Sequence, residues 1–213
     1  MFSKRITTIS ILAVSLIAFG LGVGLYSANY YKSDTGQAIT GMLWPNPKQL
    51  RHFATVDHSG DVFSLNELRG KWSFLFFGYT HCPDVCPLTL AVLDQVHEQL
   101  DNTRLASDVQ IIFVSVDSAR DQPQQLAEYV SYFNQDFIGL GGTPEQVQSL
   151  ASQIGVLYII GEEAADGEYL VDHSASLFLI DPDGRLIAIF SAPHQADPIV
   201  SRFEKIKTFL EKH

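Results

Sequence analysis

The chain has 213 residues, and its 24 acidic residues outnumber its 14 Lys and Arg residues, which gives a formal net charge of −10. A surface of this sign repels nucleic acids and anionic lipid headgroups, so neither class is expected as a partner. Hydrophobic residues make up 46% of the chain, and only two residues are cysteines. Any thiol chemistry must therefore come from a single pair.

The N-terminal segment has the composition of a membrane anchor. No charged residue lies between Arg5 and Lys32, and residues 6–25 are predominantly apolar. Twenty helical residues extend about 30 Å, which is the thickness of the hydrocarbon core of a bilayer. We therefore predict an N-terminal signal-anchor helix, transmembrane, in residues 1–31. A short stretch of small residues near its end also fits a cleaved signal peptide, which is the alternative.

The charges before this segment predict its orientation. Lys4 and Arg5 favour the cytoplasmic side of the membrane and so place the rest of the chain outside. We expect a single-pass protein of the bacterial inner (plasma) membrane, with its C-terminal domain in the periplasm. Residues 32–49 are polar, contain Gly and Pro, and are predicted to be a linker. Residues 50–213 have the length of one domain.

Beyond the linker, short apolar runs alternate with amphipathic segments. We expect a strand hairpin over residues 55–65 and further strands at residues 72–79, 109–116, 176–180 and 186–190. We expect helices at residues 87–100, 123–133, 144–154 and 198–210. Strands that alternate with helices and end in a hairpin indicate an α/β fold with a central mixed β-sheet flanked by helices. This order of elements predicts a thioredoxin-like domain.

The two cysteines lie four residues apart, directly after the apolar strand predicted at residues 72–79. Pro87 suits the start of a helix, and the residue before a proline is displaced from helical geometry, so we expect Cys86 to be the helix cap. Cys82 would then lie in the preceding loop. The positive end of a helix dipole lowers the pKa of nearby thiols and favours thiolates. Such a pair can form a disulfide, bind a soft metal ion, or remain inert and buried.

A third ligand would favour metal binding over disulfide chemistry. Among the seven histidines, His173 lies just before the strand predicted at residues 176–180, in a turn that faces the cysteine loop of a thioredoxin-like sheet. No proline occurs between Pro144 and Pro182, where a thioredoxin has the cis-proline that supports substrate docking. The alternative for His173 is a hydrogen bond to Asp172 or to the backbone, without a metal.

Two thiolates and one imidazole form a soft, open, three-ligand site. Cu(I) accepts three ligands, whereas zinc would require a fourth, such as Asp84 or Asp117. Cu(II) fits if water or a carboxylate completes a near-planar set. The residues favour copper over zinc and leave both open.

Three motifs give the chain a resemblance to a known family. Residues 77–87 (FGYTHCPDVCP), residues 116–121 (VDSARD) and residues 171–174 (VDHS) are similar to those of the SCO/SenC family of copper-binding proteins. The resemblance covers roughly residues 50–211 and implies a thioredoxin-like fold. The second motif lacks the proline that often follows its first Asp in the family.

The resemblance also implies a site and a role. Copper would be bound by Cys82, Cys86 and His173. The protein would assist assembly of the copper-A centre of a respiratory cytochrome c oxidase, either as a copper metallochaperone or by reducing the cysteines of that centre. The implied partners are the copper-A-bearing cytochrome oxidase subunit, a copper donor and a thiol reductant.

The role that the resemblance implies is that of a binding protein and not of an enzyme, with thiol-disulfide reduction as a possible activity. Oxidation of Cys82 and Cys86 to a disulfide would abolish copper binding. The alternative is a membrane-anchored periplasmic thiol-disulfide oxidoreductase or redox sensor, and the closely spaced pair argues against a peroxidase.

Asp117, Arg120 and Asp121 have two interpretations. They belong either to a partner-facing or ligand-supporting surface, or to a solvated loop with an internal ion pair.

Overall fold

A computed structural model describes residues 46–103, 105–165 and 167–212, together with Gly20, Gly22 and Leu43. The chain divides into residues 1–41 and a larger unit of residues 42–213, and only the larger unit is considered below. The anchor predicted in residues 1–31 and most of the linker predicted in residues 32–49 lie outside the described residues. Within the part of the chain that the structure describes, no helix is long and apolar enough to cross a membrane.

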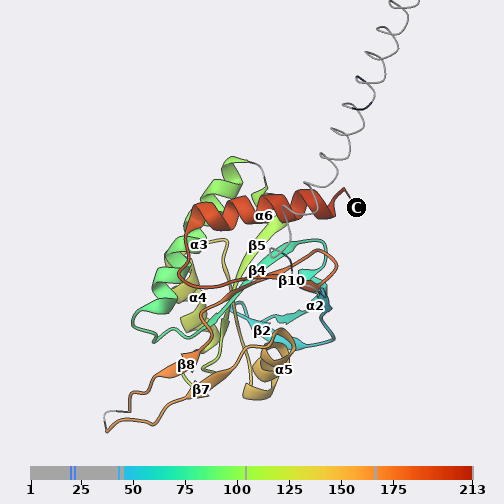
Figure 1. The fold of residues 1–213 in the computed structure, drawn as a ribbon. Coiled ribbons are helices and arrows are strands. Elements are labelled where there is room, and N and C mark those ends of the chain that lie inside the picture. Colours follow the sequence, from blue (N-terminus) through green and yellow to red (C-terminus); the bar gives the residue numbers. More distant parts are fainter. Residues whose placement is uncertain are drawn as a thin grey trace, which may run out of the picture. The chain divides into compact units, whose positions relative to one another are not determined.

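The larger unit is built on an eight-stranded mixed sheet with the strand order β1-β10-β9-β4-β5-β6-β2-β3 (Figure 1). The strands are β1 Lys48–Gln49, β2 Ala54–Asp57, β3 Val62–Ser64, β4 Trp72–Gly78, β5 Val109–Ser115, β6 Ile138–Gly141, β9 Leu177–Ile180 and β10 Arg185–Phe190. β4, β5 and β6 are parallel, and the remaining pairs are antiparallel. A separate two-stranded hairpin, β7 Tyr158–Ile160 and β8 Val171–His173, extends from the body of the unit.

Helices cover the sheet. They are α2 Leu65–Leu68, α3 Val85–Asn102, α4 Pro123–Phe133, α5 Pro144–Ile154 and α6 Ala196–Leu210, with a short 3-10 helix at Ala106–Asp108. α3 packs against both α4 and α6, α4 packs on β6, and α5 packs beside β2. The amphipathic pattern of each long helix accounts for this arrangement, because one apolar stripe is buried against the sheet and the opposite face is polar.

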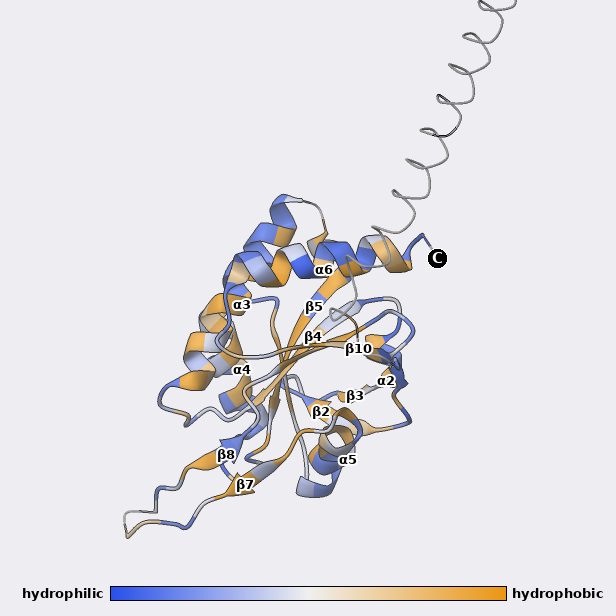
Figure 2. Ribbon diagram, viewed as in Figure 1, coloured by the Kyte–Doolittle hydropathy of each residue, from blue (hydrophilic) through white to orange (hydrophobic). Residues whose placement is uncertain are grey.

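The core is centred on β4 and β5, in which every residue is buried. Figure 2 shows the apolar character of these strands, which is typical of parallel strands covered on both faces. Phe74 packs against Phe190 of β10 and Phe203 of α6, and Phe76 packs against Phe113 of β5. One face of β4 is therefore filled with aromatic rings up to the point where the cysteine loop begins.

The topology brings three segments to one edge of the sheet. Because β4 and β5 are parallel, the loops that follow them leave the sheet at the same end. β9 is antiparallel to β4, with Leu177 opposite Phe76, so the chain enters β9 at this end as well. The cysteine loop, residues 116–122 and the end of the β7–β8 hairpin thus meet at one edge.

The predicted helices and strands of the domain are present, with differences in element bounds and in short elements. The hairpin predicted over residues 55–65 ends at Ser64, where the unpredicted helix α2 follows. Helix α3 begins at Val85 and not at Pro87. β6, β7 and β8 were not predicted, because β6 reads Ile-Gly-Leu-Gly and the two others have three residues each, too few for a visible period. Lys48 and Gln49 form the edge strand β1 on β10, so the folded part extends into the sequence predicted as linker.

Candidate metal centre

The cysteine loop is seated against the carboxyl end of β4. Cys86 is fully buried and Cys82 is half-buried. Both are free thiols. Gly78, the last residue of β4, makes room for the deeper thiol, because a Cβ at this position would lie 2.7 Å from the Cys86 Sγ. The buried sulfur is thus held between the end of β4 and the first turn of α3.

The structure brings His173 to this pair, 87 residues beyond Cys86. His173 ends β8, and its Nε2 lies 3.4 Å from the Cys86 Sγ. Ligand atoms of Cys82, Cys86 and His173 all lie within 4.8 Å of one another. Among the described residues, this is the one group of three His, Cys, Asp or Glu side chains that is close enough to hold a metal ion.

The imidazole of His173 is held in the orientation that a ligand needs. Its Nδ1 lies 3.1 Å from the Ser174 carbonyl oxygen, which can only accept, so the proton is on Nδ1 and the Nε2 lone pair faces Cys86. The rings of Phe76 and Tyr79 pack edge-on against it, each with centroids 6.0 Å away. Burial lowers the pKa of His173, which favours the neutral form that binds metal. The backbone bond considered as the alternative to ligation therefore exists, and it supports ligation instead of competing with it.

Two expectations about the cysteines were wrong. The N-cap of α3 is Asp84, so Cys86 lies inside the first turn and not at the cap. Burial raises the pKa of the Cys86 thiol, because desolvation of the thiolate outweighs the effect expected from the helix dipole. The Cys86 N–H instead donates to the Cys82 sulfur at 3.5 Å. The end of the helix therefore faces Cys82 and not Cys86.

Neither carboxylate considered as a fourth ligand for zinc belongs to the group of three ligands. Asp84 is exposed at the start of α3. Asp117 is fully buried, and its carboxylate forms an ion pair with Arg120 and accepts a hydrogen bond from the Tyr169 hydroxyl at 2.7 Å. The group that could hold a metal ion therefore offers two sulfurs and one nitrogen.

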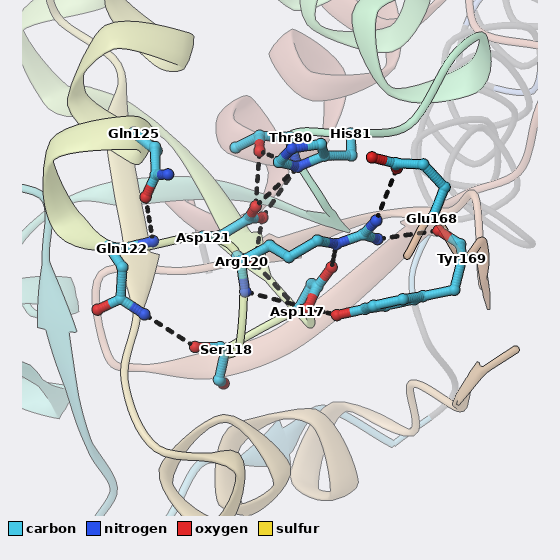
Figure 3. A network of polar contacts seen from close by, with 11 residues as sticks. Thr80, His81, Asp117, Ser118, Arg120, Asp121, Gln122, Gln125, Glu168 and Tyr169 are labelled. Carbon is cyan, nitrogen blue, oxygen red and sulfur yellow. Dashed lines mark hydrogen bonds and ion pairs between the residues drawn. The ribbon is translucent and has the colours of Figure 1, made fainter. Parts of the chain in front are cut away.

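Asp117 and Asp121 are buried and Arg120 is half-buried, and the three belong to a network of polar contacts, so their side chains are not those of a solvated loop (Figure 3). The carboxylate of Asp121 accepts hydrogen bonds from the Thr80 N–H at 2.9 Å, the Thr80 hydroxyl at 2.6 Å and the Ser115 hydroxyl at 2.6 Å. Thr80 lies two residues before Cys82, so Asp121 fixes the start of the cysteine loop. An internal ion pair, considered as part of the alternative interpretation, is present between Asp117 and Arg120.

Sequence reasoning missed three residues that shape the centre: Gly78, Thr80 and Tyr169. Gly78 and Thr80 precede the cysteines within the first motif, but their contacts with Phe113 and Asp121 join segments more than 30 residues apart. Tyr169 lies four residues before His173, and its position in an exposed, acidic stretch gave no signal of a structural role.

The family model described as SCO1/SenC matches residues 45–208 of this chain. The chain belongs to the SCO1/SenC family. A putative copper-binding protein of Stutzerimonas stutzeri is 36% identical to it over 183 residues, which cover 86% of this chain and 89% of that protein. The mitochondrial SCO2 homolog of Bos taurus is 35% identical over 191 residues, which cover 89% of this chain and 71% of that protein.

Solved structures of the family agree with the fold of this SCO1/SenC member. The crystal structure of Arabidopsis thaliana ScoI with copper bound is 36% identical and covers 74% of this chain and 98% of that one, with a TM-score of 0.69. The prediction of a mixed α/β, thioredoxin-like domain is confirmed by this likeness.

Proposed function

We propose that this protein is a copper metallochaperone that binds one copper ion through Cys82, Cys86 and His173. The observation that carries the proposal is the convergence of these three ligand atoms within 4.8 Å at one edge of the sheet. It is supported by relatives of the same family that are named as copper-binding or were solved with copper bound. Two thiolates and one imidazole suit Cu(I), which is stable with three soft ligands.

The position of the site suits transfer of the metal. Cys82 and His173 are half-buried, whereas Cys86 is fully buried. An incoming thiolate can therefore displace the accessible ligands first and the buried one last. We propose that the acceptor is the copper-A-bearing subunit of a respiratory cytochrome c oxidase, and that a copper donor loads the site. A thiol reductant would keep the pair reduced, because a disulfide cannot bind copper.

We also propose that residues 1–31 anchor the protein in the bacterial inner membrane and that the domain lies in the periplasm. The apolar run of residues 6–25, with Lys4 and Arg5 before it, supports this location. Fractionation of cells that produce the full chain, followed by protease treatment of spheroplasts, tests the proposal. Digestion of the domain in intact spheroplasts is expected, and protection until lysis would contradict it.

The function is tested by the affinity of the purified protein for Cu(I), measured by competition with a chromophoric chelator. Because each ligand supplies a direct bond to the ion, Cys82→Ser, Cys86→Ser and His173→Ala are each expected to weaken binding by about 100-fold or more, above the range for supporting residues. His52→Ala is the matched control. His52 is exposed between β1 and β2 and does not belong to the group of three ligands, so the affinity is expected to change little. Unchanged affinity in His173→Ala would overturn the three-ligand site.

A thiol-disulfide oxidoreductase is the second candidate, favoured by the two free thiols close together in the same group. Dithiol turnover depends on the cysteines alone. Reduction of a model disulfide by wild type and His173→Ala separates the two functions. Turnover that survives in His173→Ala while copper binding is lost would assign redox activity to the pair itself.

A further inference from the structure

Arg120 joins the loop after β5 to the hairpin that carries His173. Its guanidinium forms an ion pair with Asp117, donates to the Tyr169 carbonyl oxygen at 3.0 Å and lies 3.6 Å from the centroid of the Tyr169 ring. The Tyr169 hydroxyl donates back to Asp117 at 2.7 Å. Tyr169 is therefore held at its backbone, its ring face and its hydroxyl, all by one loop (Figure 3).

The rest of the hairpin offers few apolar contacts that could fix its position. Large apolar side chains of the hairpin point to solvent, with exposed fractions of 69% for Ile159 and 61% for Leu170. Val171 is buried, and Tyr158 and Tyr169 are partly buried against the core, so the apolar contacts of the hairpin are confined to its base. We therefore attribute the fixed position of the β7–β8 hairpin mainly to the polar contacts of Tyr169. His173 follows on the same strand, four residues later.

Burial makes these contacts specific. The Asp117 side chain is 0% exposed and that of Arg120 is 15% exposed. Moving the hairpin away would therefore remove the Tyr169 hydroxyl from a buried carboxylate and the Tyr169 carbonyl from a largely buried guanidinium. Arg is also suited to the task in a way that Lys is not, because one planar group can bind Asp117, bind a carbonyl and stack on a ring at the same time.

We propose that Arg120, Asp117 and Tyr169 form a latch that positions His173 for copper. The proposal rests on the proposed function, in which His173 is a copper ligand. The latch residues are not among the three residues whose atoms could hold the ion. Asp121, in the same loop, holds the start of the cysteine loop. The loop after β5 therefore supports the cysteines through Asp121 and His173 through the latch.

The first test is a double-mutant cycle for Cu(I) affinity. Arg120→Lys keeps the positive charge but loses the planar guanidinium that binds two partners and stacks on the Tyr169 ring. It is expected to weaken Cu(I) binding by about tenfold in the wild-type background. In the His173→Ala background the same change is expected to have less than about a twofold effect, because there is no ligand left to position. An equal loss in both backgrounds, or no loss in wild type, would overturn the latch. Tyr169→Phe removes one hydroxyl and provides the same cycle if Arg120→Lys fails to fold.

The second test does not involve copper and so separates failure of the latch from failure of the proposed function. In the metal-free protein, modification of His173 by diethyl pyrocarbonate is followed by mass spectrometry. Arg120→Lys and Tyr169→Phe are expected to raise the rate by several-fold, since a released hairpin exposes the imidazole. An unchanged rate in both variants would overturn the latch, whatever the copper affinity is.

Arg185→Lys is the matched control for both tests. Arg185 also forms an ion pair with a buried aspartate, Asp181, but it does so at the β9–β10 turn. This turn lies at the opposite end of the sheet, where Ile180 pairs with Ser73 at the start of β4. Loss of that pair is expected to lower stability without changing the copper affinity or the modification rate of His173. A change in either would mean that general destabilisation explains the effect of Arg120→Lys.

Discussion

Gly78 is the residue at which packing of the core and geometry of the ligands meet. A Cβ there would lie 2.7 Å from the Cys86 Sγ and 2.8 Å from Cε2 of Phe113. The Phe113 ring cannot move freely, because it packs against Phe76 and Tyr129. A methyl group would therefore displace the thiol. The absence of a side chain at this one position allows a buried sulfur to face His173.

We expect Gly78→Ala to weaken Cu(I) binding and to lower the free energy of unfolding by about 1–3 kcal/mol, the usual cost of overpacking. Chelator competition and urea denaturation measure the two effects. Gly139→Ala is the control, since a Cβ in this β6 glycine would meet Leu126 and Val130 and no ligand. It should lower stability and leave the copper affinity unchanged. Wild-type affinity in Gly78→Ala would show that the thiol is not constrained by this contact.

At the scale of elements, the start of α3 explains why the cap was misassigned from the sequence. The first turn of a helix has N–H groups without partners in the helix, so a proline is tolerated throughout that turn and does not mark its first residue. Pro87 is the third residue of α3. One of the free N–H groups, that of Cys86, donates to the sulfur of Cys82. Cys82, which is proposed as a copper ligand, thus also accepts a hydrogen bond from the first turn of α3.

Helix α5 offers a test in which stability changes and the site does not. Its N-cap, Thr143, exchanges hydrogen bonds with Gln146 in a capping box. Thr143→Ala is expected to lower the free energy of unfolding by about 1 kcal/mol, measured by urea denaturation, because an N–H group loses its acceptor. The copper affinity should be unchanged. Ser149→Ala, an exposed position within the same helix, should be neutral. Equal effects of the two substitutions would contradict the role of the cap.

At the scale of the whole molecule, the ligands come from two segments that are far apart in the chain, one before α3 and one before β9. Copper that binds both segments should therefore stabilise the entire fold and not one loop. A ligand at 100 times its dissociation constant adds about 2.7 kcal/mol to the stability of the folded state. For a domain of this size, that corresponds to a rise of roughly 5–10 °C in Tm.

We expect this rise when Cu(I) is added under reducing conditions, as measured by differential scanning calorimetry, and its reversal by a strong Cu(I) chelator. Cys86→Ser is the control, because it lacks the central buried ligand and should show little increase. A similar increase in Tm for Cys86→Ser would indicate that copper stabilises the protein from another site.

The sequence was sufficient to predict the alternating strands and long helices, because their apolar periods are local properties of the chain. It also predicted that Cys82 and Cys86 act together, since four residues cannot separate them widely. His173 was predicted only with the help of a fold, because nothing local connects it to residues 87 positions earlier. The three-residue strands β7 and β8 and the glycine-containing strand β6 were not predicted, because they form only by pairing with neighbouring strands and have no clear apolar period of their own.

The chain by itself therefore determined the class of fold and the thiol pair, which follow from residue types and local patterns, whereas His173 could be predicted as the third ligand only through the fold. Only the tertiary structure decided how that ligand is held. The orientation of His173 depends on a carbonyl, two rings and the contacts of Tyr169 with Arg120 and Asp117. The raised pKa of Cys86 likewise follows from burial. Burial and hydrogen bonding across the sheet edge are collective properties, and they exist only once distant segments have packed together.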